Sequence, residues 1–201
     1  MALISVSNNA LQNITAVPAS IPTGALVLLS TQTASSSASL SFTSGIDSTY
    51  DSYVFKFIDM HPSTDEVQFQ FQVNQSGQTG FNEIITSTVF KPFHYEDGSD
   101  YNLTYRTGAD QAQGTNYQLL AEGVGSDNDQ TCSGYLQIFN PSSDTFVKHF
   151  IARGQASQLN DGSGDSFVAG YINVTGSITE VSFKFSSGNI DDGIIKMYGV
   201  K

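Results

Sequence analysis

The residues of this chain that could do acid–base or metal chemistry are few and scattered. Its three histidines are His61, His94 and His149, and none has a second His or a Cys at the spacing that zinc sites require. The single cysteine, Cys132, has no histidine close to it in the sequence, and the chain contains no Gly-x-Ser-x-Gly motif. We therefore predict that the protein is not an enzyme and has no catalytic residues, no metal site and no cofactor.

Three acidic segments, 96–100, 127–129 and 161–165, each carry several oxygen atoms that could bind calcium. None of them matches the twelve-residue loop of an EF-hand. Asp, Asn, Ser and Gly are also the residues that form tight turns. We interpret the three segments as turns, and calcium binding stays an alternative that a loss of thermal stability on adding EDTA would support.

Aromatic residues near the first acidic segment could contact a sugar if they lie on exposed loops. The candidates are Phe93, Tyr95 and Tyr101, with Phe81 further upstream. Packing in the core is the commoner role of such rings in all-β proteins. The sequence therefore favours core packing and keeps glycan contact as the alternative.

The distribution of charge divides the chain. Residues 1–46 contain no Asp, Glu, Lys, Arg or His. Within this lead, Pro18 and Pro22 favour extended backbone, and about 23 extended residues can reach on the order of 75 Å. We predict that residues 1–23 form an extended arm that docks on another chain through its apolar residues, which are Leu3, Ile4, Val6, Leu11, Ile14, Val17 and Ile21.

The remaining 24–201 is long enough for one domain with its own core. The chain has 8 Lys and Arg against 19 Asp and Glu, for a net charge of -11. This balance argues against binding to nucleic acid and against adhesion to an anionic membrane. The N-terminus lacks the positive region of a signal peptide, so we expect synthesis and assembly inside a cell.

A period of two residues runs through most of the chain from Tyr50 onward, as β-strands require. In residues 67–73 it is complete, since Val and Phe alternate with Gln. We expect the run 53–60 to form a hairpin with 67–73 through the turn residues 61–66. Further strands are predicted at 25–29, 38–42, 132–140, 146–153, 167–174, 181–185 and 194–200, the last after a turn at 191–193. The strand pattern is weaker at 84–90, 103–106 and 117–122, so not all three are counted as strands.

No window of a dozen residues has a convincing helical period, although one turn of helix is possible near 109–116. Nine to eleven short strands without helices predict an all-β fold. We expect a two-sheet antiparallel sandwich of jelly-roll type that carries the extended N-terminal arm.

Several segments resemble a family of small virion structural proteins of marine tailed bacteriophages that infect cyanobacteria and abundant ocean bacteria. They are MALIS at 1–5, IPTGALVLLSTQTA at 21–34, FTSGIDSTYDSYVFKF at 42–57 and DGIIKMYG at 192–199. The resemblance spans most of the chain, and it implies a β-sandwich of the virion, assembled in the bacterial host cytoplasm. It carries no catalytic residues and leaves a place on the head or the tail open.

From these observations we expect a non-enzymatic capsid decoration or cement protein, whose arm and body stabilise the phage head. Its partners would be the major capsid protein and further copies of itself, as in a trimer. The alternative is a protein of the tail or fibre, with a tail protein as partner, that binds a host-surface glycan through Phe93, Tyr95 and Tyr101.

Overall fold

The computed structural model describes residues 26–201. The predicted docking arm, 1–23, lies outside the described residues, and so do its seven apolar residues. The domain boundary predicted at residue 24 falls there as well, and these expectations stay predictions.

Twelve antiparallel strands make up the fold of residues 26–201. They are β1 (Val27–Thr33), β2 (Leu40–Phe42), β3 (Ser52–Pro62), β4 (Val67–Gln75), β5 (Ile85–Tyr95), β6 (Tyr101–Tyr105), β7 (Gln118–Val124), β8 (Cys132–Phe139), β9 (Lys148–Gln158), β10 (Gly162–Ile172), β11 (Ile178–Phe185) and β12 (Ile190–Val200). The all-β antiparallel prediction is confirmed. The one turn of helix that the sequence allows near 109–116 does not form, because this segment is a loop of turns and bends.

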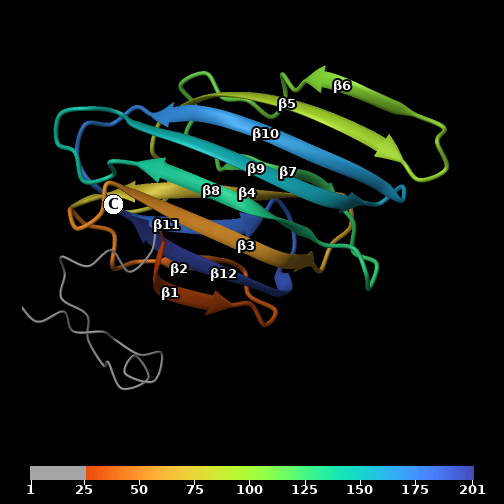
Figure 1. The fold of residues 1–201 in the computed structure, drawn as a ribbon, viewed down its shortest axis with the longest axis horizontal. Helices are drawn as coiled ribbons and strands as arrows, with labels where there is room; N and C mark the ends of the chain where they lie inside the picture. Colours follow the sequence, from red (N-terminus) through yellow and green to blue (C-terminus); the bar gives the residue numbers. More distant parts are fainter. Residues whose placement is uncertain (1–25) are drawn as a thin grey trace, which may run out of the picture.

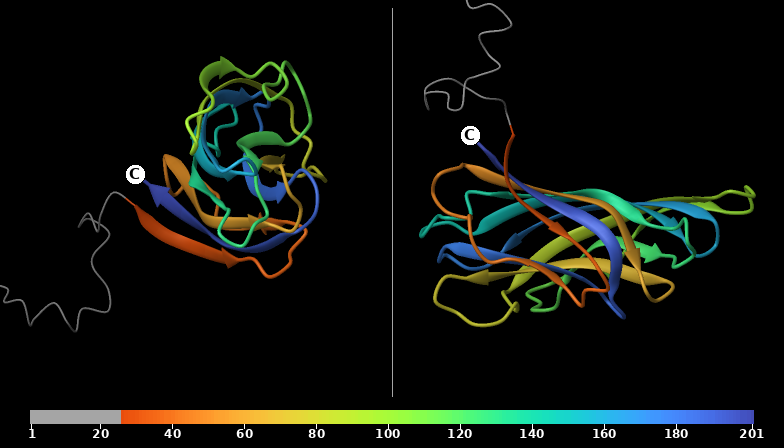
Figure 2. Two further views of the ribbon diagram at one scale, coloured as in Figure 1. Left: turned by 90° about the vertical axis from the view of Figure 1, so that its right-hand side faces the viewer. Right: turned by 90° about the horizontal axis from the view of Figure 1, so that it is seen from below.

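The strands form one nearly closed, barrel-like sheet. Its hydrogen-bonded order is β1-β12-β3-β8-β9-β7-β4-β11-β2, while β10, β5 and β6 continue from β9 on a second branch. Figure 1 shows β6, β5, β10, β9, β8 and β3 side by side, with β4 and β11 behind them. The end-on view in Figure 2 (left) shows the strands curling around a common interior.

The alternating sequence of β4 places one face in this interior, as predicted. Val67, Phe69, Phe71 and Val73 are all buried. Phe69 packs against Phe57 of β3, with ring centroids 5.1 Å apart, and against Phe185 of β11 at 5.2 Å. Burial of these rings away from water is the main favourable contribution to folding.

The predicted hairpin between residues 53–60 and 67–73 is wrong. Strand β3 pairs with β12 on one side and with β8 on the other. Strand β4 pairs instead with β11 and β7. Both edges of β3 are therefore occupied, and the turn at 63–66 crosses the core to the other side of the sheet, where β4 faces β3 through ring contacts.

The predicted turn at 191–193 also proves to be part of a strand. Strand β12 begins at Ile190, and its register with β3 shifts on both sides of Asp192. Gly193 has a φ of 129°, and a Cβ there would lie 2.7 Å from Sδ of Met60. The segment is thus a β-bulge, whose close approach to β3 requires glycine.

One lysine is completely buried at the start of β9. The Nζ atom of Lys148 donates hydrogen bonds to the carbonyl oxygens of Val174 (3.2 Å), Thr175 (2.7 Å) and Gly176 (2.6 Å). Burial lowers the pKa of the Lys148 ammonium, and the charge of Asp144 opposes this shift. The ammonium therefore caps three carbonyls of the loop between β10 and β11.

We expect Lys148→Met to lower the free energy of unfolding by about 2 kcal/mol, since the carbonyl groups lose their donor while the volume is nearly conserved. Urea unfolding followed by circular dichroism measures this change. Lys184→Met is the matched control, because Lys184 is partly exposed and its Nζ lies 4.4 Å from the centroid of the Tyr117 ring. A Lys148→Met protein as stable as this control would contradict the structural role.

Candidate functional site

Two basic side chains and one carboxylate, Lys91, Arg106 and Glu122, meet in a pocket of about 290 Å³. Its walls come from the second half of β5, from Arg106 just after β6, from the end of β7 and from the end of β9. We call it the Lys91 pocket and define it by the residues that carry the argument below: Lys91, Phe93, Tyr95, Arg106, Glu122 and Gln158.

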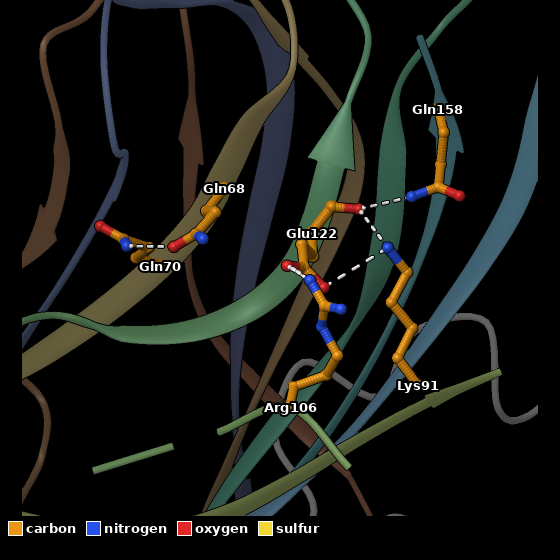
Figure 3. Close-up of polar contacts among 6 residues, drawn as sticks. All are labelled: Gln68, Gln70, Lys91, Arg106, Glu122 and Gln158. Carbon is orange, nitrogen blue, oxygen red and sulfur yellow. Dashed lines mark hydrogen bonds and ion pairs between the residues drawn. The ribbon is translucent and has the colours of Figure 1, made fainter. Parts of the chain in front are cut away.

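Glu122 is the centre of the charged groups in the pocket. Its Oε2 atom lies 3.4 Å from Nζ of Lys91, and its Oε1 atom accepts a hydrogen bond from Nη2 of Arg106. Its backbone carbonyl accepts from Nε2 of Gln158 at 3.2 Å. Figure 3 shows Lys91 and Arg106 directed toward the carboxylate of Glu122, and Gln158 toward its backbone carbonyl.

Lys91 is the most buried member of this group. Its side chain is 9% exposed, and that of Glu122 is 14% exposed. Burial lowers the pKa of the Lys91 ammonium, while the negative charge of Glu122 raises it. Removing an ammonium from water is costly unless partners replace its hydration. Here the replacement is incomplete, because both contacts of Nζ are long: 3.4 Å to Oε2 and 3.5 Å to the carbonyl oxygen of Glu122.

The carboxylate is also incompletely satisfied. Its Oε2 atom is buried and accepts no hydrogen bond in the described part of the chain. Buried polar atoms in folded proteins nearly always have a hydrogen-bond partner, and exceptions call for an explanation. The pocket therefore contains a hydrogen-bond donor, Nζ of Lys91, beside an acceptor, Oε2 of Glu122. Each of these atoms can form further hydrogen bonds.

Two glycines make room for these side chains. A Cβ at Gly164 in β10 would lie 2.8 Å from Cε of Lys91 and 2.9 Å from Cδ of Gln158. A Cβ at Gly123 would lie 2.8 Å from Nε2 of Gln158, and Gly123 also has a φ of 73°. Glycine at both positions is thus required by the close approach of the pocket's polar side chains.

The structure brings together two of the three predicted glycan contacts. Phe93 and Tyr95 line the Lys91 pocket, and their ring centroids lie 5.4 Å apart. Tyr101 lies on the other face of the sheet, where it is 73% exposed and packs edge-on against His94. Phe93 and Tyr95 lie in a strand and not on loops, because β5 continues to Tyr95 through its pairing with β6 and β10. The favoured packing in the core is wrong for these residues, since both rings are only half-buried and Tyr101 is exposed.

Comparison with known proteins adds no identity. No protein-family model, no curated protein and no solved structure matches this chain.

The acidic segments do not form a metal site in residues 26–201, where no three His, Cys, Asp or Glu side chains gather around a possible ion. Segment 96–100 belongs to the turn between β5 and β6, in which Oδ1 of Asp97 accepts from the backbone N–H of Ser99 at 2.8 Å. Segment 161–165 mostly belongs to β10, so the turn prediction is wrong there. No helix among the described residues is long and apolar enough to span a membrane.

The histidines lie apart from one another and from the pocket floor. Nδ1 of His61 lies 2.8 Å from the carbonyl oxygen of Gln130. His149 packs against Tyr171, and His94 packs against Tyr101. Each has a structural neighbour that accounts for its position.

Sequence reasoning missed the charged floor of the pocket. Residue type and spacing do not single out Lys91, Arg106, Glu122 or Gln158 as members of one group. One signal was present, since Lys91 continues the alternation of the buried residues Ile85 and Val89. A lysine on the apolar side of a strand is rarely buried without a partner. Its partners could not be read from the sequence, because they come from strands far away in the chain.

We expect Glu122→Gln to lower the free energy of unfolding by about 2–3 kcal/mol, because it leaves the Lys91 ammonium buried without an opposite charge. The double variant Lys91→Met/Glu122→Gln should recover at least about 1 kcal/mol of this loss, since it removes both charges. Urea titration of the two variants and of Lys91→Met gives the coupling energy. Strictly additive losses would show that the ion pair does not act as a unit.

Cys132 is fully buried at the start of β8, and burial strongly raises the pKa of its thiol. Because the thiolate is the reactive form, we expect iodoacetamide to alkylate native protein at least about 100-fold more slowly than protein unfolded in urea. Mass spectrometry of timed samples measures both rates. Equal rates would contradict the burial and reopen a chemical role for this cysteine.

Proposed function

We propose that the protein is a non-enzymatic virion structural protein of a tailed bacteriophage, and that it serves as a capsid decoration or cement protein. In this proposal it binds the major capsid protein through the outer face of its body and through the N-terminal arm. The proposal combines the resemblance of the sequence with one observation, the concentration of exposed apolar and aromatic side chains on that outer face.

The outer face lies on strands β6, β5, β10, β9, β8 and β3, which Figure 1 shows side by side. Successive cross-strand partners form a continuous row there, which we call the aromatic row: Tyr105, Phe90, Phe167, Arg153, Tyr135 and Lys56. The Phe90 and Phe167 rings stack at 4.8 Å with an interplanar angle of 5°. Arg153 lies over Phe167 at 4.6 Å and is paired with Asp165. The row is thus a fixed surface and not a set of independent side chains.

Much of this surface remains accessible. Tyr105 is 53% exposed and Phe90 is 43% exposed, and the neighbouring Leu103 and Ile151 are exposed as well. Next to the row, a mainly apolar hollow of about 420 Å³ opens between Ile151 and Tyr171. Contiguous exposed apolar area typically marks an interaction surface, and a hollow can receive an anchoring side chain of a partner.

Strand β1 offers a second means of attachment. It pairs with β12 on one edge and has no strand partner on its other edge among the described residues. An open edge can accept an extended chain through backbone hydrogen bonds. The predicted arm precedes β1 in the sequence, so arms of neighbouring copies are suitable occupants of such edges.

Several finer features belong to the same proposal. We infer a jelly-roll-type body, in which β7, β4, β11 and β2 act as a second sheet, because β7 and β9 share a single residue pair, Val124 with Gln158. We also infer a homo-oligomer, a trimer in the simplest case. Many copies bound to the capsid would together make many weak contacts with it, and these would stabilise the capsid against its internal pressure. The working place would be the virion, after assembly in the bacterial host cytoplasm.

Two changes test the attachment. Removal of residues 1–23 and, separately, Tyr105→Asp/Ile151→Asp should each lower the number of copies on purified particles by at least about tenfold, because each removes central binding contacts. Quantitative mass spectrometry of virions measures the occupancy, and Gln70→Asp on β4, on the other side of the body, is the control. Full occupancy with both changes would reject the proposal, and a native count of only a few dozen copies would place the protein on the tail.

A further inference from the structure

We infer that the Lys91 pocket binds one neutral pyranose residue. The inference does not depend on a place in the virion, and it rests on the unsatisfied pair at the pocket floor. The Nζ atom of Lys91 can donate three hydrogen bonds but makes only two long contacts, and Oε2 of Glu122 accepts none. A ligand that accepts from the first and donates to the second satisfies both.

A hydroxyl group has this combination of properties, because it donates one hydrogen bond and accepts others. A carboxylate or phosphate only accepts, and it would be repelled by Glu122. An ammonium only donates, and it would be repelled by Lys91. Neighbouring hydroxyls on a sugar ring can bridge the 3.4 Å between Nζ and Oε2 and also reach the amide of Gln158.

The walls of the pocket fit the remainder of a sugar ring. Phe93 and Tyr95 extend from the same strand into the pocket, at an interplanar angle of 45°. The C–H groups of a pyranose form an apolar patch that can pack on such rings. A few placed polar groups beside aromatic walls are the usual composition of small-ligand sites.

The volume limits the ligand to one residue. The pocket measures about 290 Å³, at the lower end of the range of roughly 300–1,000 Å³ for small-molecule sites. A longer glycan could place only a terminal residue in it. A free monosaccharide has the same chemistry, and the experiment below separates these two sources.

The charge of the lining favours a neutral sugar over an acidic one. Lys91 and Arg106 are balanced by Glu122 and Glu66, which also lines the pocket. Both cations already lie against Glu122, and the whole chain carries a net charge of -11. A uronic or sialic acid would therefore find no excess of positive charge.

The test is a titration of the full ¹⁵N-labelled chain, followed by its amide NMR spectrum. The probes are the methyl glycosides of glucose, galactose and mannose, the methyl glycoside of glucuronic acid, and oligosaccharides that end in each neutral sugar. We expect saturable shifts at Gly123, Gln158 and Gly164 with at least one neutral glycoside, with Kd on the order of millimolar for so few contacts. The glucuronide should bind at least about tenfold more weakly.

Variants assign the binding to the pocket. Tyr95→Ala and Lys91→Met should each weaken it by about tenfold or more. Tyr101→Ala should leave it unchanged, because Tyr101 lies on the other face of the sheet. If Lys91→Met does not fold, as its amide spectrum will show, Lys91→Met/Glu122→Gln replaces it. Binding of an oligosaccharide at least as tight as that of its methyl glycoside would identify a glycan terminus as the source, because only the terminal residue enters the pocket. Loss of binding by the oligosaccharide would identify the free sugar.

Three results would overturn the inference: no saturable shift up to about 100 mM of any neutral probe, preference for the glucuronide, or shifts that respond to Tyr101→Ala and not to Tyr95→Ala. None of them bears on attachment to a capsid, which depends on the aromatic row and the arm. Conversely, if changes in the aromatic row lower the number of copies on the particle, the expected result of the sugar titration does not change.

Discussion

The packing of phenylalanine rings across the interior is the interaction on which the rest of the fold depends. Phe69 of β4 contacts Phe57 of β3 as well as Phe183 and Phe185 of β11. Phe55 and Phe42 continue this contact toward β2. The contacts of β3 rings with β4, β11 and β2 join strands that share no hydrogen bonds, so they hold the two sides of the curved sheet together. Without them, the single residue pair between β7 and β9 could not fix how the sheet closes.

This arrangement explains which parts of the fold the sequence could predict. The alternation in residues 67–73 follows from burial on one side of a strand, and that is a local property. The partner of a strand is not local. Residues 61–66 have the composition of a turn, which fits a chain that returns beside β3 as well as one that crosses the core. Because both edges of β3 are paired, with β12 and with β8, the chain crosses the core here. The same limit applies to 191–193, whose turn-like residues form a bulge because Gly193 must approach Met60.

The site was predicted only in its aromatic part, for a related reason. The aromatic residue type made Phe93 and Tyr95 candidates for sugar contact, and their alternate spacing in β5 places both in the pocket. Lys91 belongs to the same alternation, but its meaning depends on Glu122, which β7 supplies from about thirty residues downstream. Ion pairs of this kind arise from the register of distant strands, which composition and spacing do not contain.

The two buried lysines differ in how completely their hydrogen-bonding capacity is used. Both have a pKa lowered by burial, yet Lys148 has three carbonyl acceptors at hydrogen-bond distance, while Lys91 has only long contacts beside a pocket. Burial alone therefore does not separate the two lysines, whereas the long contacts of Lys91 and its place in a pocket wall do.

Strand β5 contributes side chains to both the aromatic row and the Lys91 pocket, on opposite faces of the strand. Its alternation sends Phe90 to the outer face and Lys91, Phe93 and Tyr95 to the pocket. A partner that covers the aromatic row would contact the opposite side of this strand, so it would not occupy the pocket. Attachment to a shell and recognition of a sugar are thus compatible on one body, because the two-residue period of a single strand separates the groups that each of them needs.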